Sequence, residues 1–302
     1  MSLFFLILTS GHFLTIDSMS EIEVLPGRVG NLTPEQQHAL DEFKELIKAE
    51  GIYTPERHDD HLLLRFLRAR KFHIGHTHKM FVDCENWRKE LGVDQLRETF
   101  IFEEEEAVLS CYPRYYHNVD KKGRPIYIEH IGVIDIKTLF KVTDEDRMTK
   151  QHVLSYEKLI TDRMPACSKR AGHHIEQCCT ILDLKGVSLR QFANAFGFIK
   201  RTSAIAQNYY PEMMGKMYVI NAPMMFTSVW GMVKPLLDEV TVKKIVILGS
   251  NYKATLLEDI DAENLPAAIG GTCDCAESGG CQTGEPGPWK DPRYMNVVEK
   301  TA

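Results

Sequence analysis

None of the short motifs that mark the common catalytic sites occurs in this sequence. It contains no glycine-rich dinucleotide or nucleotide loop, no Gly-x-Ser-x-Gly nucleophile elbow and no His-Glu-x-x-His zinc pair. Asp183, His173 and His174 could be combined into an acid–base group, but nothing in their spacing requires one. Because no nucleophile motif is present, the sequence predicts a binding protein and not an enzyme.

A strong excess of charge of either sign is also missing. The 36 basic and 42 acidic side chains leave a formal net charge of −6, within an otherwise ordinary globular composition. A negative protein does not suit nucleic acid, nor a steady electrostatic attachment to anionic membranes. We therefore expect no nucleic-acid partner. We expect any contact with a membrane surface to be transient and to depend on apolar side chains or on a local basic patch.

Cysteines are too few for a disulfide scaffold, since eight of them are scattered over 302 residues. This pattern favours a reducing compartment. Cys273, Cys275 and Cys281 are close enough along the chain to suggest zinc, but no histidine or fourth cysteine lies near them in the sequence. The sequence therefore predicts no metal site and no cofactor. It predicts instead a turn-rich, loosely packed tail over residues 276–302, with Trp289 as a residue that could dock.

The first hundred residues consist of a short extension followed by a region with a helical pattern. Residues 1–25 are an uncertain extension, because the apolar run at 3–8 has no preceding positive charge and no small-residue cleavage site after it. Met19 is the better candidate for the functional initiator. Residues 26–100 then show a capping box that begins at Thr33, apolar residues at helical spacing, and two further helices of the same kind. They predict a helical N-terminal subdomain.

Residues 101–275 change to an alternation of strands and helices. The pattern predicts strands at 126–129, 178–183, 217–221 and 244–249, with helical segments between them. Strands that alternate with crossover helices form a mainly parallel sheet. We therefore expect an α/β fold, in which a helical N-terminal subdomain is followed by a mainly parallel β-sheet lobe.

The longest stretch without a charge, seventeen residues, lies between Lys216 and Lys234. Pro223 divides it into the predicted strand and a short helix over 224–233, for which Asn221 is available as a cap. That helix is about 15 Å long, half the ~30 Å of a bilayer core, so it cannot cross a membrane. Its apolar side chains are Met224, Met225, Phe226, Val229, Trp230, Met232 and Val233.

Three interpretations of this helix stay open on the residues alone: a buried core helix, a mobile lid over an apolar cavity, and a partner-binding helix. A lipid carrier needs such a lid. Two acyl chains of about sixteen carbons lose on the order of 25 kcal/mol in water, at ~0.8 kcal/mol per CH₂. An anionic headgroup also needs cations and hydrogen-bonding groups inside the protein. The candidates for that role are Arg70, Lys71, Glu212, Thr241 and Lys244.

Several long motifs in register support this hypothesis. They are LLRFLRARKF (63–72), YPRYYHNVDKKGRPIYIE (112–129), RMPACSKRAGH (163–173), ILDLKG (181–186), QNYYPEMMGKMYVINAP (207–223), NLPAAIGG (264–271) and GPWKDP (287–292). With them the sequence resembles the CRAL-TRIO lipid-binding family, and most of all its phosphatidylinositol/phosphatidylcholine transfer proteins of the secretory pathway. The similarity runs from about Pro26 to Pro292.

The resemblance implies a lipid pocket whose floor is the parallel sheet and whose gating helix is 224–233. It also implies which residues hold the phosphatidylinositol headgroup. These are Lys71, with Arg70 beside it, Glu212, Thr241 and Lys244.

A second ligand, phosphatidylcholine, is implied as well. In the family it is bound by tyrosines that can face the choline cation and by hydroxyl groups that contact the phosphate. Tyr116, Tyr127 and Thr180 agree with this pattern. Cys178 stands where these proteins typically have serine, and a thiol is a poorer donor. Met213 also stands where a basic residue is common. Phosphatidylinositol is therefore the firmer prediction, and the identity of the second lipid stays open.

The function implied by the resemblance is that of a non-enzymatic, cytoplasmic protein that exchanges phosphatidylinositol and a second lipid between membranes. We expect a monomer in transient peripheral contact with Golgi or endosomal membranes. There it would support phosphoinositide synthesis and secretory trafficking. The alternative is a non-transferring sensor or adaptor that binds another hydrophobic ligand, such as a sterol-like or isoprenoid molecule.

Overall fold

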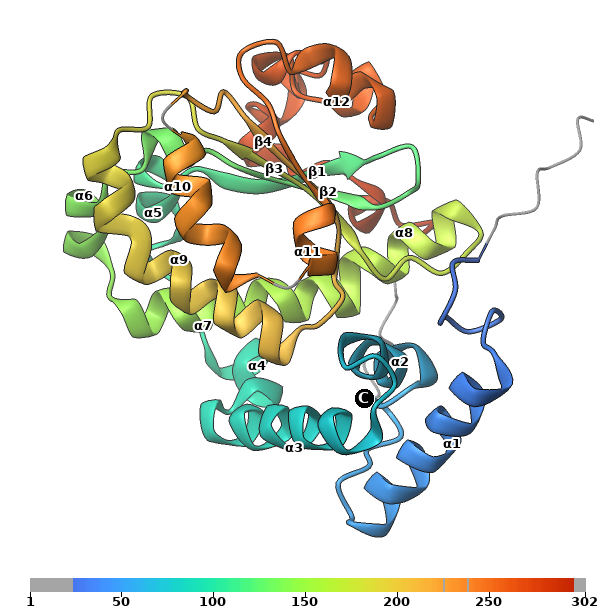
Figure 1. The fold of residues 1–302 in the computed structure, drawn as a ribbon. Coiled ribbons are helices and arrows are strands. Elements are labelled where there is room, and N and C mark those ends of the chain that lie inside the picture. Colours follow the sequence, from blue (N-terminus) through green and yellow to red (C-terminus); the bar gives the residue numbers. More distant parts are fainter. Residues whose placement is uncertain (1–23, 225, 238, 296–302) are drawn as a thin grey trace, which may run out of the picture.

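The computed structural model describes residues 24–295 except 225 and 238, and at 189–196, 199, 227–229 and 236 it describes the backbone only. A helical N-terminal part lies against an α/β lobe (Figure 1). The helices of the N-terminal part are α1 (Pro34–Ala49), α2 (Asp60–Ala69), α3 (Ile74–Leu91) and the short α4 (Leu96–Thr99).

The lobe consists of a sheet and the helices that connect and cover its strands. The strands are β1 (Arg114–Val119), β2 (Pro125–Glu129), β3 (Cys178–Asp183), β4 (Met214–Ile220) and β5 (Ile245–Ile247). The helices are α5 (Glu105–Cys111), α6 (Ile136–Val142), α7 (Glu145–Lys158), α8 (Met164–Ala171), α9 (Leu189–Tyr209), α10 (Phe226–Val233), α11 (Glu239–Lys243), α12 (Lys253–Asp259) and α13 (Cys281–Gly284).

Capping and aromatic packing form the N-terminal part, as the sequence predicts. The Thr33 side chain accepts from the backbone N–H of Gln36, and the Gln36 side chain accepts from the N–H of Thr33, so the capping box is complete. Phe81 of α3 lies edge-on to Phe43 of α1 and Phe66 of α2, with ring centroids 5.4 and 5.2 Å apart. All three rings are buried, and they join the three helices into one core.

The sheet has the strand order β1-β2-β3-β4-β5. Strands β2 to β5 are parallel, and β1 pairs with β2 in the antiparallel direction. The predicted α/β fold with a mainly parallel sheet is therefore confirmed. Strand β1 is missing from the prediction because its residues, RYYHNV, show no clean alternation of apolar and polar side chains. It is a strand because β2 is its partner.

The two faces of the sheet are covered to different degrees. On one face Ile126 and Tyr218 pack in the cluster that includes α12, and neither is more than 1% exposed. On the other face Met217 and Ile245 are half-buried and Ile247 is 37% exposed. Figure 1 shows α9, α10 and α11 on this second side. Apolar side chains in a sheet keep accessible surface where nothing packs tightly on them. This face, called the open face below, can therefore receive an apolar ligand.

The C-terminal segment is better ordered against the lobe than the predicted tail. Trp289 is 7% exposed and lies edge-on to Tyr116 of β1, with ring centroids 6.2 Å apart. The backbone N–H of Asn118 donates to the carbonyl oxygen of Pro286 at 2.6 Å. The docking suggested for Trp289 is thus present, and the loose packing expected of 276–302 does not extend to these residues. The partners lie on β1, far away in sequence, where local composition gives no sign of them.

Candidate functional site

Three of the five predicted headgroup residues meet at the amino ends of β4 and β5, which we call the charged edge of the sheet. Glu212 precedes β4 and Lys244 precedes β5, and the amino ends of neighbouring parallel strands lie side by side. Lys244 Nζ is 3.4 Å from Glu212 Oε2. The backbone N–H of Lys244 donates to the carbonyl oxygen of Thr241 at 3.1 Å, which holds the end of α11 at the same place. The two charged side chains are about one-fifth exposed, so a ligand can reach them.

Glu212 is held in an unusual backbone conformation. Its φ of +61° lies in the left-handed region, which a non-glycine residue adopts at a cost of about 1–3 kcal/mol. The carbonyl oxygen of Glu212 accepts from Gln177 Nε2 at 3.1 Å, which helps to keep that conformation. The turn directs the carboxylate toward Lys244 instead of continuing the direction of β4.

The other two headgroup residues lie on the N-terminal part. Arg70 and Lys71 follow α2, where Lys71 has a φ of +52° and its side chain is exposed. Arg70 Nη1 donates to the carbonyl oxygen of Ala69 at 3.0 Å. Among the described residues, no hydrogen bond or ion pair joins Arg70 or Lys71 to the three residues at the sheet edge. The structure thus brings three of the five together and leaves these two on a separate element.

The end of α2 is nevertheless within electrostatic range of Glu212. Burial lowers the pKa of Arg68, and the carboxylates of Glu176 and Glu212 oppose that shift. Arg68 and Arg28 both bind the Glu176 carboxylate, at 2.7 and 2.6 Å, and so fasten α2 to the lobe. Sequence reasoning misses this joint, although Arg68 stands in the arginine-rich motif of residues 63–72.

The four predicted phosphatidylcholine residues form a row on the same side of the sheet as the open face, but in a covered part of it, where Tyr116, Cys178 and Thr180 are buried. Tyr116 of β1 pairs with Tyr127 of β2, which in turn pairs with Thr180 of β3. The two tyrosine ring centroids are 5.0 Å apart. Cys178 Sγ lies 3.7 Å from Thr180 Oγ1, since residues two apart on a strand share a face. The structure therefore places all four side chains together, beside the cluster formed by α7, α8 and the C-terminal segment.

One ring of this row already faces a cation. The Arg163 guanidinium lies 4.1 Å from the centroid of Tyr116 and 5.8 Å from that of Trp289, and it pairs with Glu285 at 3.2 Å. Sequence reasoning misses Arg163, although it begins the motif of residues 163–173. A choline group that contacts Tyr116 must use the part of the ring that Arg163 leaves uncovered.

Glu129 is a second residue that the predictions omit. It lies two residues beyond Tyr127 on β2 and therefore shares the open face. Burial raises the pKa of Glu129, and a hydrogen bond donated by the Tyr112 hydroxyl opposes the shift. The alternation of PIYIE is the signal that could have identified it, because it places Glu129 beside Tyr127.

Helix α10 is not a buried core helix. Met224, just before it, is 98% exposed and Met232 is 53% exposed. Phe226, Trp230 and Val233 are half-buried. Met225 and the side chain of Val229 lie outside the described residues. The helix begins at Phe226, and Asn221 does not cap it. Instead, Asn221 Nδ2 donates to Asp183 Oδ1 at 2.7 Å, because its φ of +53° turns it toward the end of β3.

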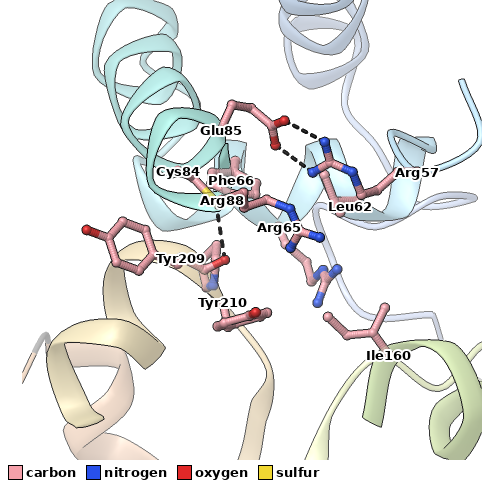
Figure 2. A pocket seen from close by; sticks show the side chains of 11 residues that line it. Arg57, Leu62, Arg65, Phe66, Cys84, Glu85, Arg88, Ile160, Tyr209 and Tyr210 are labelled. Carbon is pink, nitrogen blue, oxygen red and sulfur yellow. Dashed lines mark hydrogen bonds and ion pairs between the residues drawn. The ribbon is translucent and has the colours of Figure 1, made fainter. Parts of the chain in front are cut away.

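The helical part and the lobe also enclose a small pocket (Figure 2). Figure 2 shows Arg57 and Glu85 joined to each other in its lining, and the Cys84 thiol pointing toward the carbonyl oxygen of Tyr209. The two hydrogen bonds from Arg57 to Glu85 are 2.6 and 2.5 Å long. The ring of Trp87 stacks on Tyr209 at 4.0 Å. Arg57 pairs with Glu85, and Arg88 pairs with Glu157 of α7 at 2.8 Å. Since the second pair joins side chains of the two parts, we interpret this pocket as a joint between them.

The sequence shows no histidine near Cys273, Cys275 and Cys281, but the folded chain brings one beside them. His117 of β1 lies beside the three cysteines of the C-terminal segment, and its Nε2 is 3.6 Å from Cys275 Sγ. The missing histidine is 158 residues from Cys275 along the chain, where no spacing rule finds it.

The helical N-terminal part, the sheet with one open apolar face and the polar groups at its edge define an α/β protein suited to an apolar ligand with a charged end. The chain belongs to the CRAL-TRIO family. The CRAL/TRIO domain model matches residues 109–271, and the CRAL/TRIO N-terminal domain model matches residues 39–83.

Named relatives cover most of the chain. It is 50% identical to the Sec14 cytosolic factor of Schizosaccharomyces pombe over 89% of this chain and 93% of that protein. It is 47% identical to the SEC14 cytosolic factor of Kluyveromyces lactis over 90% of each chain. It is 43% identical to the phosphatidylinositol/phosphatidylcholine transfer protein SFH12 of Arabidopsis thaliana, over 87% of this chain and 49% of that protein.

A solved structure supports the fold. The crystal structure of Sfh5 superimposes with a TM-score of 0.60 at 20% identity, covering 73% of this chain and 82% of that one. Within the described ranges, every helix is too short or too polar to cross a bilayer.

Proposed function

We propose that this protein is a phospholipid transfer protein that binds phosphatidylinositol and exchanges it between membranes. The observation that carries the proposal is the open face of the sheet, where Met217, Ile245 and Ile247 keep accessible surface next to the Glu212–Lys244 pair. Acyl chains would cover this apolar surface while the headgroup lies at the charged edge. The high identity to Sec14 cytosolic factors over most of both chains supports the same function.

The charged edge suits an inositol phosphate. Without a ligand, Lys244 and Glu212 neutralise each other at 3.4 Å. A lipid phosphate would compete for the Lys244 ammonium and form charge-assisted hydrogen bonds with it. Glu212, which can only accept when ionised, would then accept from inositol hydroxyl groups. Thr241 lies beside Lys244, and Arg70 with Lys71 would approach from the end of α2. A choline headgroup has no hydroxyl groups to donate, so this edge favours phosphatidylinositol.

The second lipid belongs to the row of Tyr116, Tyr127, Cys178 and Thr180. The tyrosine rings supply surfaces for a quaternary ammonium, and Thr180 supplies a hydroxyl donor for a phosphate. The relatives in Arabidopsis thaliana that are named as phosphatidylinositol/phosphatidylcholine transfer proteins support phosphatidylcholine as this ligand.

Helix α10 acts as the gating helix in this proposal. The exposed Met232 of α10 and Met224 just before it would enter the interfacial region of a bilayer while the lobe opens, and would return to the lobe when the protein leaves. We further propose that the protein is a monomer, works without catalysis in the cytoplasm and contacts Golgi or endosomal membranes only transiently. The name of its relatives as cytosolic factors supports the compartment.

The headgroup assignment can be tested with the double variant Lys71→Ala/Lys244→Ala. Transfer of labelled phosphatidylinositol between donor and acceptor vesicles should fall at least about tenfold, since two charge-assisted contacts of about 1.5–3 kcal/mol each are lost. Transfer of phosphatidylcholine should stay close to wild type. Lys243→Ala is the matched control, because Lys243 is an exposed neighbour in α11. Unchanged phosphatidylinositol transfer by the double variant would sink the assignment.

The sensor or adaptor alternative predicts a different bound ligand. Mass spectrometry of lipid that co-purifies with the wild-type protein should detect phosphatidylinositol. A neutral sterol-like or isoprenoid molecule as the only bound lipid, together with no vesicle transfer, would favour the alternative.

A further inference from the structure

Four zinc-type ligands from two distant parts of the chain meet beside the sheet. Cys273, Cys275 and Cys281 lie on the C-terminal segment that follows α12, and His117 lies on β1. Their four ligand atoms all lie within 4.8 Å of one another. His117 is completely buried, and the three cysteines are partly buried. The cluster is outside the candidate lipid site, since His117 and Tyr116 are neighbours on β1 and point to opposite faces.

The measured separations match a tetrahedral ligand sphere. Zinc lies about 2.3 Å from sulfur and about 2.0–2.1 Å from nitrogen, so tetrahedral ligands are about 3.8 Å (S–S) and about 3.6 Å (S–N) apart. Cys273 Sγ and Cys275 Sγ are 3.5 Å apart, and Cys275 Sγ is 3.6 Å from His117 Nε2. No sulfur atom is part of a disulfide among the described residues. The set can therefore close around one ion with small movements.

A hydrogen bond fixes the histidine in the correct tautomer. His117 Nδ1 is 3.0 Å from the carbonyl oxygen of Asn264. A carbonyl oxygen can only accept, so in the neutral ring the proton is on Nδ1 and the lone pair is on Nε2. That lone pair faces Cys275. A carbonyl that orients the far nitrogen of a histidine is the usual outer partner of a zinc ligand.

The backbone also positions the ligands. The pairing of β1 with β2 shifts register between Tyr116 and Val119, so His117 lies in an irregular part of the strand. Cys275 has a φ of +48°, which turns the segment back on itself. The carbonyl oxygen of Cys273 accepts a hydrogen bond from the backbone N–H of Ala267 at 2.8 Å. The backbone N–H of Cys273 donates to the carbonyl oxygen of Leu265 at 3.1 Å. Thiols that only filled a core would not need this conformation.

A second group of possible ligands, His61, His174 and Glu176, does not make a comparable site. Its two rings stack at 3.5 Å. The Glu176 carboxylate already binds Arg28 and Arg68. A cation would have to compete with two guanidinium groups there, whereas among the described residues no lysine or arginine forms an ion pair or hydrogen bond with the cysteine thiols.

We propose that His117, Cys273, Cys275 and Cys281 bind one Zn²⁺ in a closed structural site. Four protein ligands leave no open position for catalysis. Binding converts three thiols to thiolates, releases their three protons to solvent and changes no oxidation state. The ion joins the C-terminal segment to β1 just before Glu285 and Trp289, which contact Arg163 and Tyr116. Zinc therefore stabilises the docking of the C-terminal segment, with Glu285 and Trp289, beside Tyr116.

The test is the zinc content of the full chain, purified with a reductant and without a chelator and measured by plasma mass spectrometry. We expect about one zinc per wild-type chain, and less than about 0.2 in Cys275→Ser and in Cys281→Ser. Cys111→Ser is the matched control, because it removes a buried thiol of α5 that donates only to a backbone carbonyl. It should keep about one zinc per chain.

Cobalt substitution of the wild-type protein keeps the proposal testable if the variants fail to fold. Co²⁺ added to reduced, metal-free protein should give the thiolate-to-metal charge-transfer band and the intense visible bands of a tetrahedral site. One equivalent of Zn²⁺ should abolish both. Wild-type protein that holds no zinc and gives no such spectrum would overturn the proposal, as would full zinc retention by Cys281→Ser.

Discussion

At the residue scale, one side chain in the row of Tyr116, Tyr127, Cys178 and Thr180 is a poor hydrogen-bond donor. This side chain is the thiol of Cys178. Cys178 is buried beside Thr180, and burial raises the pKa of its thiol, so the group is neutral. A neutral thiol donates weakly to a phosphate. In the proposed second-lipid site, the tyrosines and Thr180 would contact phosphatidylcholine, and the thiol of Cys178 would weaken that contact.

Cys178→Ser should therefore raise phosphatidylcholine transfer relative to phosphatidylinositol transfer by about two- to tenfold, the equivalent of one added hydrogen bond. Vesicle transfer assays with each labelled lipid measure the ratio. Cys179→Ser is the control, because Cys179 faces the sealed side of the sheet under α12. No change in the ratio for Cys178→Ser would mean that the site tolerates the thiol or does not bind this lipid.

The family resemblance selected residues that the strand register brings together, whereas contacts between elements had no signal in the sequence. Tyr127 and Thr180 are direct partners in the parallel register of β2 and β3. Arg163 over Tyr116 depends instead on how α8 and the C-terminal segment dock, which no local pattern specifies.

At the element scale, the uncharged stretch that follows Lys216 becomes two elements with different exposure. Strand β4 is central in the sheet, whereas α10 keeps apolar side chains in water. An apolar helix that is neither buried nor long enough to span a bilayer suits a surface that meets lipid only at intervals. The short length and the apolar character of α10 were predictable, but its exposure was not.

Trp230→Asp should reduce vesicle-to-vesicle transfer about tenfold or more, because a charge in α10 opposes entry into the bilayer interface. Met224→Asp should have a similar effect with no loss of thermal stability, since Met224 is 98% exposed. Transfer per folded molecule and the Tm by calorimetry are the two measurements.

Ile101→Asp provides the control for that experiment, because Ile101 is an apolar residue that is 71% exposed and lies between α4 and α5, outside α10. It should leave transfer unchanged. A large loss of Tm in Trp230→Asp with transfer per folded molecule preserved would indicate a packing role for the helix.

At the scale of the whole molecule, a half-buried histidine whose Nε2 atom has no accessible surface couples the lobe to pH. His152 of α7 has an Nε2 atom without accessible surface or hydrogen-bond partner, and its ring lies edge-on to Tyr156 at 5.1 Å. Burial lowers the pKa of His152 to about 4 from 6.5, and the Arg114 guanidinium adds to the shift. The folded protein thus keeps the ring neutral where the unfolded chain protonates it.

This depressed pKa contributes stability that is complete above about pH 6.5 and is lost as the pH falls toward 4, because the unfolded state takes up the proton first. Between pH 7 and 4.5 the loss from this group is about 2–3 kcal/mol. His152→Phe should remove that part of the pH dependence in chemical denaturation. His38→Gln, at an exposed position of α1, should behave as wild type does. Equal pH slopes for wild type and His152→Phe would contradict the argument.

The joint between the helical part and the lobe also belongs to this scale. Glu176 lies in the lobe and binds Arg28 and Arg68, which belong to the N-terminal part. Through this joint the end of α2, with Lys71, is kept near the sheet edge that carries Glu212 and Lys244. The proposed headgroup site, which is divided between two parts of the chain, would therefore form only when the whole chain has folded.

The sequence by itself determined the elements: helices to about residue 100, then strands and crossover helices that impose a mainly parallel sheet. Local periodicity and capping decide these features, because they depend on neighbours a few residues away. Only the tertiary structure decided that one sheet face is sealed and the other open, that Trp289 docks on β1, and that His117 joins three distant cysteines. Such contacts depend on the docking of distant segments, and their free energy comes from surface that is buried only in the complete fold.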